Sequence, residues 1–264
     1  MHNSIQSRIG YFVSVLAIAL LFIGISHAQI TLDFEDGSLD AWEVVDEPDE
    51  NLGDTGPSTW EIRDSQLGLD GKALYQGSNA WGAPPDNMLL GPIILYKGER
   101  FTNFTLDVDV AAADNDGMGI VWAFDSLEQH YRVIMINDRW PDPDPLDGIG
   151  GPFLKVDKRI SNDSPWYELV EVIPGRDGGP YVPYSEGVRL HWTLEVENGE
   201  FTFTRDDGHS ISGSDNAYLD GFVGIQLYAQ QVEFDNLTIT PGPPTAVDAK
   251  GKLATAWGAI KATR

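Results

Sequence analysis

An alternating run that ends in an Asn-Gly pair constrains the fold of this chain most strongly. Within residues 188–197 the apolar side chains fall at every second position, at Leu190, Trp192, Leu194 and Val196. Alternate side chains of an extended strand point to opposite faces, so one face is expected to be buried and the other solvated. Asn198 and Gly199 follow, and both positions of a two-residue hairpin turn need a positive φ. Residues 200–205 alternate again, which predicts an antiparallel hairpin.

Similar short runs recur along the body of the chain, and none has the 3.6-residue period of a helix. They cover residues 30–34, 60–62, 101–110, 118–124, 131–136, 153–160, 166–173, 221–228 and 232–239. Residues 118–124 and 131–136 are apolar almost throughout and are expected to be central strands. With 28 Gly and 16 Pro residues the chain is also rich in turns. These features predict an all-β protein, an antiparallel sandwich or barrel, without a repeat of fixed period.

Three groups of residues, taken in order, add a resemblance to this pattern. They are residues 34–42 (FEDGSLDAW), residues 114–125 (DNDGMGIVWAFD) with residues 129–134 (QHYRVI), and residues 221–228 with residues 232–239. The ordered set resembles the concanavalin-A-like jelly-roll sandwiches of the laminin-G, legume-lectin and thrombospondin C-terminal type, over residues 30–240. The resemblance implies a jelly-roll β-sandwich, but this fold hosts lectins, adhesion modules and glycosidases alike.

The N-terminal residues have the features of a secretion signal. An apolar run at residues 9–25 follows Arg8 and ends in Ser26-His27-Ala28, a pattern that suits cleavage before Gln29. An uncleaved anchor is the alternative, although the run is short for a membrane-spanning helix. The sequence therefore predicts a signal peptide at residues 1–28 and a sandwich at residues 29–240. It places the mature protein outside the cell, at the cell surface or in the periplasm, with no stable membrane span.

Residues 241–264 form a Pro/Gly linker and a tail of different character. Four of the tail's charged residues are basic (Lys250, Lys252, Lys261 and Arg264), and Asp248 is its one acid. Leu253, Trp257 and Ile260 share one face of a short helix. Two readings remain open: a loosely held, partly helical tail, or a signal that engages a sorting machinery.

The charge balance argues against a nucleic-acid partner. The chain carries 41 acidic and 17 basic side chains, which gives a formal net charge of −24. A protein that binds nucleic acid needs a basic surface, so a nucleic-acid partner is not expected. Cysteine is absent, which excludes disulfides, thiolate metal sites and a cysteine nucleophile.

Calcium is the one cofactor that the sequence suggests. Asp114, Asn115 and Asp116 lie in one turn before Gly117, and calcium prefers oxygen ligands of this kind. Thrombospondin-like domains have a calcium site near this turn, so the resemblance implies the same metal here. Asp-Asn-Asp-Gly is equally a favoured β-turn sequence with no metal.

Two further acidic groups are weaker calcium candidates. The loop with Asp142, Asp144 and Asp147 misses the spacing of a calcium-binding loop. The resemblance suggests another group, in which Glu35, Asp36 and Asp235 would join the first and last strands.

Sugar binding needs exposed aromatic faces beside polar loops, because the apolar faces of sugars stack on flat rings. The loop candidates are Trp81, Trp140, Tyr181 and Tyr184. The alternative is that these rings cap the open ends of the sandwich.

No catalytic residue is assigned. Glucanases of this fold class carry a tight E-x-D-x-x-E run, and the nearest run here is Glu195 to Glu200. Its middle carboxylate is a Glu, and Glu200 lies beyond the Asn-Gly turn. The sequence therefore predicts a secreted, non-catalytic recognition module that binds an extracellular glycan or another extracellular ligand such as a cell-surface protein, with calcium as a stabiliser. A structural or adhesion protein and a glycoside hydrolase are the alternatives.

Overall fold

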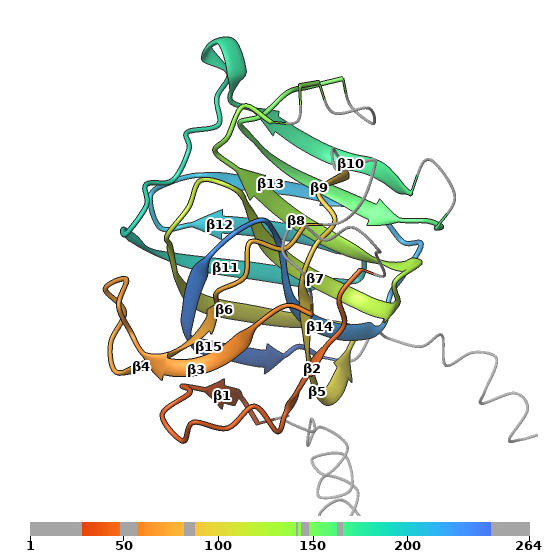
Figure 1. Cartoon of the computed structure of the whole chain (residues 1–264). Helices are drawn as coiled ribbons and strands as arrows, with labels where there is room; N and C mark the ends of the chain where they lie inside the picture. Colours follow the sequence, from red (N-terminus) through yellow and green to blue (C-terminus); the bar gives the residue numbers. More distant parts are fainter. Residues whose placement is uncertain are drawn as a thin grey trace, which may run out of the picture.

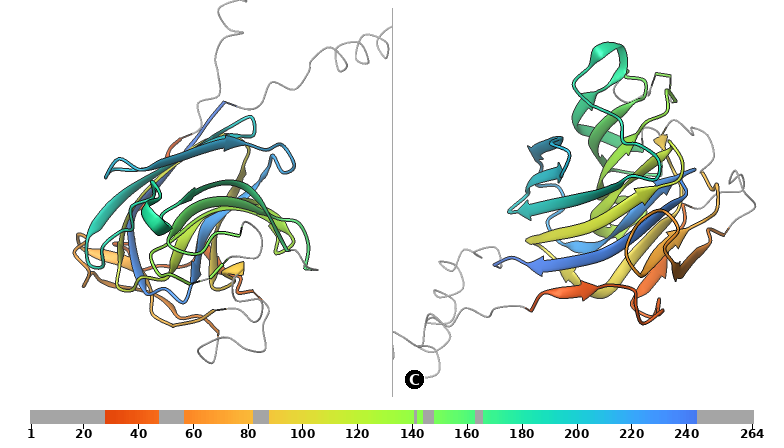
Figure 2. Two further views of the ribbon diagram at one scale, coloured as in Figure 1. Left: turned by 90° about the horizontal axis from the view of Figure 1, so that it is seen from above. Right: turned by 90° about the vertical axis from the view of Figure 1, so that its left-hand side faces the viewer.

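The fold is described by a computed structural model, which covers residues 28–47, 57–81, 88–140, 142–143, 148–162 and 166–243. Within these ranges the chain forms fifteen β-strands and one short 3₁₀ turn, η2 (Arg176–Gly178). The strands make two antiparallel sheets that face each other (Figures 1 and 2). The predicted all-β sandwich is confirmed.

Sheet A runs through β13 (Ser210–Ser214), β12 (Glu200–Arg205), β11 (Arg189–Glu197), β6 (Phe104–Ala112), β15 (Val232–Pro241), β4 (Lys72–Gln76) and β3 (Trp60–Asp64), and β1 (Ile30–Leu32) also pairs with β15. Sheet B runs through β10 (Tyr167–Pro174), β9 (Phe153–Arg159), β8 (Gln129–Ile136), β7 (Gly117–Ser126), β14 (Gly221–Tyr228), β5 (Ile93–Phe101) and β2 (Trp42–Val44). Neighbouring strands in each sheet are often far apart in sequence, so the chain crosses repeatedly between the layers.

The hairpin of β11 and β12 forms as the sequence predicts. Glu197 pairs with Glu200, and Asn198 and Gly199 have φ values of 53° and 83°. Trp192 and Leu194 are fully buried between the sheets, whereas Glu195 is exposed on the outer face of sheet A. Two-residue alternation therefore identified the face that packs in the core.

The other predicted strands are present, with one error. Residues 101–110 were expected to be a single strand, but β5 ends at Phe101 and β6 begins at Phe104. Asn103 explains the break, because its side chain accepts a hydrogen bond from Asn198 N (2.8 Å) and donates one to Pro243 O. These two side-chain hydrogen bonds hold residues 102–103 as a turn between β5 and β6.

Sheet B is covered on both faces, which explains the apolar runs of β7 and β8. Its outer face also holds a buried ion pair, in which Arg132 donates to both carboxylate oxygens of Asp157 (2.6 and 3.1 Å). Arg132 donates in addition to the carbonyl oxygens of Leu89 (2.9 Å) and Met88 (2.7 Å). Both charged side chains are 0% exposed. The pair therefore anchors the segment before β5 across sheet B.

Some predictions fall outside the described residues. These are the signal peptide up to residue 27, the tail from residue 244, and Asp144 and Asp147 of the second acidic loop. In the part of the chain that the structure describes, no helix has the length and apolar character needed to span a membrane.

Candidate functional site

Three loops at one end of the sandwich bring the predicted site residues together. The β6–β7 turn carries Asp114 to Asp116, the β8–β9 loop carries Trp140, and the β10–β11 loop carries Tyr181 and Tyr184. We call this region the loop end. The backbone N–H groups of Asn137 and Asp138 both donate to Asn115 O (3.0 Å each), which joins the first two loops. A bond from Gly187 N to Ala112 O (2.7 Å) holds the third loop beside the first.

The acidic turn, residues 114–116, is held from below by a buried amide. Gln230, in the connection from β14 to β15, is 0% exposed. Its Nε2 donates to Asp114 O and Asp116 O (3.0 Å each), and its Oε1 accepts from Asp114 N (3.1 Å). With the backbone oxygens turned inward, the carboxylates are left as the groups that this turn offers to a ligand.

The electrostatics of the acidic turn are unfavourable to a full set of negative charges. Burial, with the charges of Asp114 and Asp138, raises the pKa of Asp116 from 3.8 to about 7. Like charges in a partly desolvated site disfavour ionisation, and a hydroxyl donor or a cation would relieve the repulsion. A perturbed carboxyl in a loop cluster is a physical marker of a functional site.

Only the side-chain oxygens of the acidic turn are suitable ligands for calcium. The backbone oxygens of residues 114–116 accept hydrogen bonds from protein donors, which leaves the side-chain oxygens as the groups most open to a cation. Among the described residues, no group of three or more acidic or histidine side chains is placed to hold a metal ion. The carboxylates of Asp114, Asp116 and Asp138 are hard oxygen donors of the type that calcium prefers, but they would have to converge further.

Tyr181 and Tyr184 have a different role from the one expected. They are only 2% and 6% exposed and belong to the main core between the sheets, so the expectation of exposed rings at these positions is wrong. Tyr184 donates its hydroxyl to Asp116 O and accepts from Gln230 Nε2 (2.7 Å). Burial raises the pKa of Tyr184 well above 10, so the hydroxyl keeps the proton that it donates. The two tyrosines support the loop end from inside.

The two tryptophans lie nearer the surface. Trp140 is 45% exposed, while Trp81 is partly buried against a cluster that includes Ile136 and Tyr228. The backbone next to Trp140 is closely packed, because a Cβ on Gly151 would lie 2.2 Å from Asp138 O and 2.7 Å from Trp140 O. Arg176 also donates to Arg139 O (2.8 Å) and pairs with Asp142. Trp140 is therefore an aromatic ring presented on a constrained loop.

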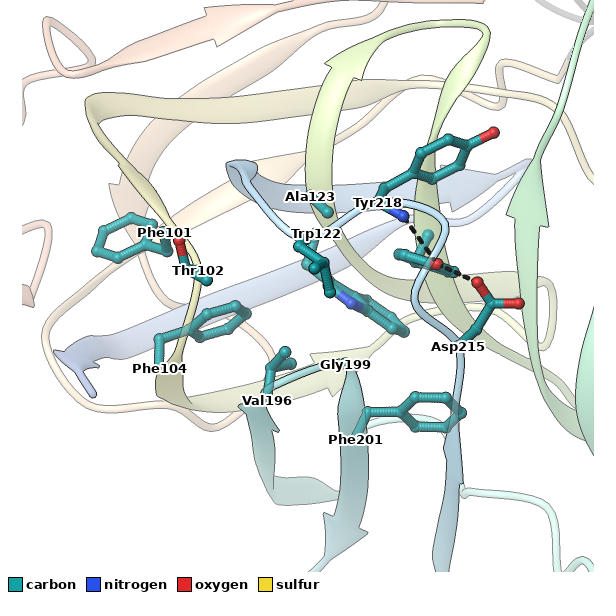
Figure 3. A pocket seen from close by; sticks show the side chains of 12 residues that line it. Phe101, Thr102, Phe104, Trp122, Ala123, Val196, Gly199, Phe201, Asp215 and Tyr218 are labelled. Atoms are coloured by element: carbon teal, nitrogen blue, oxygen red, sulfur yellow. Dashed lines mark hydrogen bonds between the residues drawn. The ribbon is translucent and has the colours of Figure 1, made fainter. Parts of the chain in front are cut away.

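The opposite end of the sandwich has an aromatic pocket that is too small for a sugar. It is lined by rings such as Trp122, Phe104 and Phe201, and Tyr131 donates its hydroxyl there to Asp215 (Figure 3). Its free volume of ≈ 10 Å³ has room for about one water molecule. This pocket is a packed corner of the core.

A shallow groove of ≈ 310 Å³ on the outer face of sheet A contains the only glutamate run that resembled a catalytic one. It is lined by Glu195, Glu197 and Glu200, with Thr105 and Thr202 beside them. All three glutamates are exposed. The general acid of a glycoside hydrolase usually lies in an enclosed position beside the scissile bond, whereas these three carboxylates lie on an open face.

Two residues of the loop end had no signal in the sequence. Asn137 and Gln230 are isolated amides in the sequence. Only the fold shows that the Gln230 side chain bonds to both the acidic turn and Tyr184, and that Asn137 bonds to Asn115 through its backbone and to Tyr184 through its side chain. An amide at the end of a strand has no spacing rule that could have identified it.

Comparison with known proteins supports the fold. No protein-family model and no curated protein matches the sequence. A solved Bacillus subtilis protein of unknown function with a galectin-like fold is 10% identical, with a TM-score of 0.51 over 83% of this chain and 98% of that chain. The Bacillus subtilis carbohydrate-binding module CBM66 is 15% identical, with a TM-score of 0.49 over 76% of this chain and 95% of that one.

Toad ovary galectin, solved in complex with thio-digalactose, is 10% identical, with a TM-score of 0.38 over 54% of this chain and 92% of that one. The first of the three similarities shows that the sandwich is galectin-like. The lectin-type β-sandwich expected from the concanavalin-A-like resemblance is confirmed at the level of the fold.

Proposed function

We propose that this protein is an extracellular, non-catalytic recognition module that binds carbohydrate at the loop end. The exposed ring of Trp140, fixed on a loop beside the acidic turn, is the observation that carries the proposal. A flat ring offers a stacking surface for the apolar face of a sugar, and carboxylates accept hydrogen bonds from its hydroxyl groups. The galectin-like fold supports the same reading, and the extracellular location rests on the N-terminal sequence.

Asp114, Asp116 and Asp138 supply the polar part of the site in this proposal. At neutral pH a carboxyl with a pKa of about 7 is present in both protonation states, so Asp116 can donate to or accept from a sugar hydroxyl. Neutral glycans suit such a site better than acidic glycans, because the chain carries a formal net charge of −24.

Calcium at this turn is a second part of the proposal. A divalent cation between the carboxylates of Asp114, Asp116 and Asp138 would offset their mutual repulsion, and it would favour the ionised form of Asp116. The support is the raised pKa of Asp116 and the oxygen chemistry of the three side chains.

A glycan array with matched variants tests the proposal. The wild-type chain should bind at least one glycan class, and Trp140→Ala should lose that binding. Leu219→Ala is the matched control, because Leu219 is an equally exposed apolar side chain (43%) that lines the pocket at the opposite end of the sandwich. Absence of binding to every glycan, with and without millimolar calcium, would refute the proposal, as would equal binding by the Trp140 variant.

A further inference from the structure

The groove on the outer face of sheet A lies beside the last residues of the chain that the structure describes. Gly242 and Pro243, which follow β15, form part of its wall. The rest of the wall comes from β6, β11 and β12, which lie side by side with β15 in the sheet (Figure 1). No described segment covers its three glutamates, which are exposed: Glu195, Glu197 and Glu200. This part of sheet A is therefore an open face that a further segment could cover.

Hydrogen bonds hold Gly242 and Pro243 at the edge of the groove. Gly242 N donates to Asn103 O (2.7 Å), and the side chain of Asn103 donates to Pro243 O. The same side chain accepts from Asn198 N (2.8 Å), in the turn between β11 and β12. The segment that follows Pro243 therefore starts beside this turn.

The groove carries negative charge with no basic neighbour. Glu197 and Glu200 are directly opposite each other across the hairpin, and Glu195 lies two positions earlier on the same face of β11. Like charges at opposite positions of paired strands repel each other. No Lys or Arg is among the described residues that line the groove. A basic segment would therefore relieve the repulsion.

Residues 244–264, which we call the tail, have the complementary charge. Asp248 is the one acidic residue of the tail, and its basic residues are Lys250, Lys252, Lys261 and Arg264. The excess of positive charge in the tail stands against a formal net charge of −24 for the whole chain.

The tail is long enough to reach the glutamates. Lys250 is seven residues beyond Pro243. Seven residues span at most about 25 Å when extended, and about 15 Å on average as a flexible chain. The distance across the sheet from β15 to β12 is three strand spacings, about 14 Å. Because the tail is tethered beside the groove, its effective concentration there is high enough for weak ion pairs to form.

We propose that the tail docks in the groove of its own chain, where Lys250 and Lys252 pair with Glu195, Glu197 and Glu200. The docked tail covers the open face of sheet A, and any other partner of the tail has to compete with the groove. Salt weakens the docking, because the charges are exposed. The docking does not depend on a glycan at the loop end, since the groove lies at the start of β6 and the acidic turn follows its end.

Paramagnetic broadening in NMR spectra of the full chain measures the docking. The chain has no cysteine, so Ala254→Cys provides a single attachment site for a nitroxide label. At low salt the label should broaden the backbone amide signals of Thr105 and Thr202, which line the groove. The same sample with a reduced nitroxide is the reference.

Removing the charge of either partner should release the tail. Glu197→Gln/Glu200→Gln and Lys250→Gln/Lys252→Gln should each reduce the broadening to less than about a third of its original size, because the remaining contacts are weak. About 1 M salt, where the Debye length is about 3 Å, should have the same effect on the wild-type groove.

Glu61→Gln/Glu171→Gln is the matched control. It removes the same two charges from exposed positions in β3 and β10, outside the groove, so the broadening should remain unchanged. Equal broadening in the groove variant, the tail variant and this control would overturn the inference, because a tail that moves freely would broaden the signals in every variant alike.

A mixed sample identifies the chain that supplies the tail. It contains ¹⁵N-labelled protein without nitroxide and ¹⁴N protein with nitroxide, so that only contacts between two copies broaden the observed signals. Thr105 and Thr202 should remain sharp in this sample. Broadening as strong as in the singly labelled chain would assign the groove to the tail of a second copy, and would overturn docking within one chain.

Discussion

Replacing Asp116 by Asn should remove a pH dependence from the stability of the protein. The folded-state pKa of Asp116 is about 7, whereas the carboxyl of an unfolded chain titrates near 3.8. Between these values the folded state binds a proton that the unfolded state has lost. Stability therefore falls as the pH rises from about 4 to about 7 and stays low above 7.

The magnitude follows from the pKa. A difference between 3.8 and about 7 corresponds to about 4 kcal/mol for a carboxyl fully shielded from water, at 1.36 kcal/mol for each pH unit. Asp116 is partly exposed, so solvent screening reduces the expected effect to about 1–2 kcal/mol. The difference in unfolding free energy, Asp116→Asn variant minus wild type, should therefore be about 1–2 kcal/mol larger at pH 8 than at pH 4.

Urea unfolding of both proteins across pH 4 to 8, in chelator, measures this difference. Chelator is needed because a cation bound only to the folded state would add stability at high pH. Adding millimolar calcium at pH 8 should then stabilise the wild type and not the variant. A difference between the two proteins that stays constant over the whole pH range would show that Asp116 is not held protonated by its surroundings.

Three other changes have defined outcomes. Arg132→Met should lower the free energy of unfolding in urea by at least about 2 kcal/mol, because it removes the hydrogen bonds to Asp157, Met88 and Leu89 and leaves Asp157 with the weaker pairing to Lys155 (3.4 Å). An unchanged free energy of unfolding would mean that Arg132 is not the anchor. Trp140→Ala should lower glycan affinity at least tenfold, about 1.4 kcal/mol, with an unfolding free energy within about 0.5 kcal/mol of the wild type. Gly151→Ala should lower the free energy of unfolding by about 1–3 kcal/mol and also weaken glycan binding, because the added Cβ would displace Asp138 O. An unchanged melting temperature would contradict this close approach.

The sequence predicts the long strands well because their signal is local. Trp192 and Leu194 alternate with polar neighbours and are buried as expected, and the Asn198-Gly199 turn has the required positive φ values. The missed strands β2, β4, β5 and β13 are different. For example, β13 alternates in burial, but Gly213 at its second inward position has no side chain, so the sequence shows one apolar residue among serines. In β4 three of the five residues are buried, so this strand lacks the simple alternation of a half-buried strand.

The candidate site is predictable only in part. The sequence around Asp114 and Asp116 predicts an acidic turn, and the sequence around Trp140 predicts an aromatic residue in a loop. Tyr181 and Tyr184 look equally suitable in sequence, and only the fold shows that they face the core. Whether a loop residue is buried depends on how far the neighbouring sheet extends, and the local sequence pattern does not predict that extent.

Chemical-shift mapping with the strongest ligand from the glycan array would test recognition at the loop end most directly. Backbone amide shifts should concentrate at residues 113–116, 137–140 and 175–184, and the indole N–H of Trp140 should move with them. Shifts concentrated around Glu195 and Glu197 on the outer face of sheet A, with an unmoved Trp140, would place the binding site elsewhere and contradict the proposed function of the loop end.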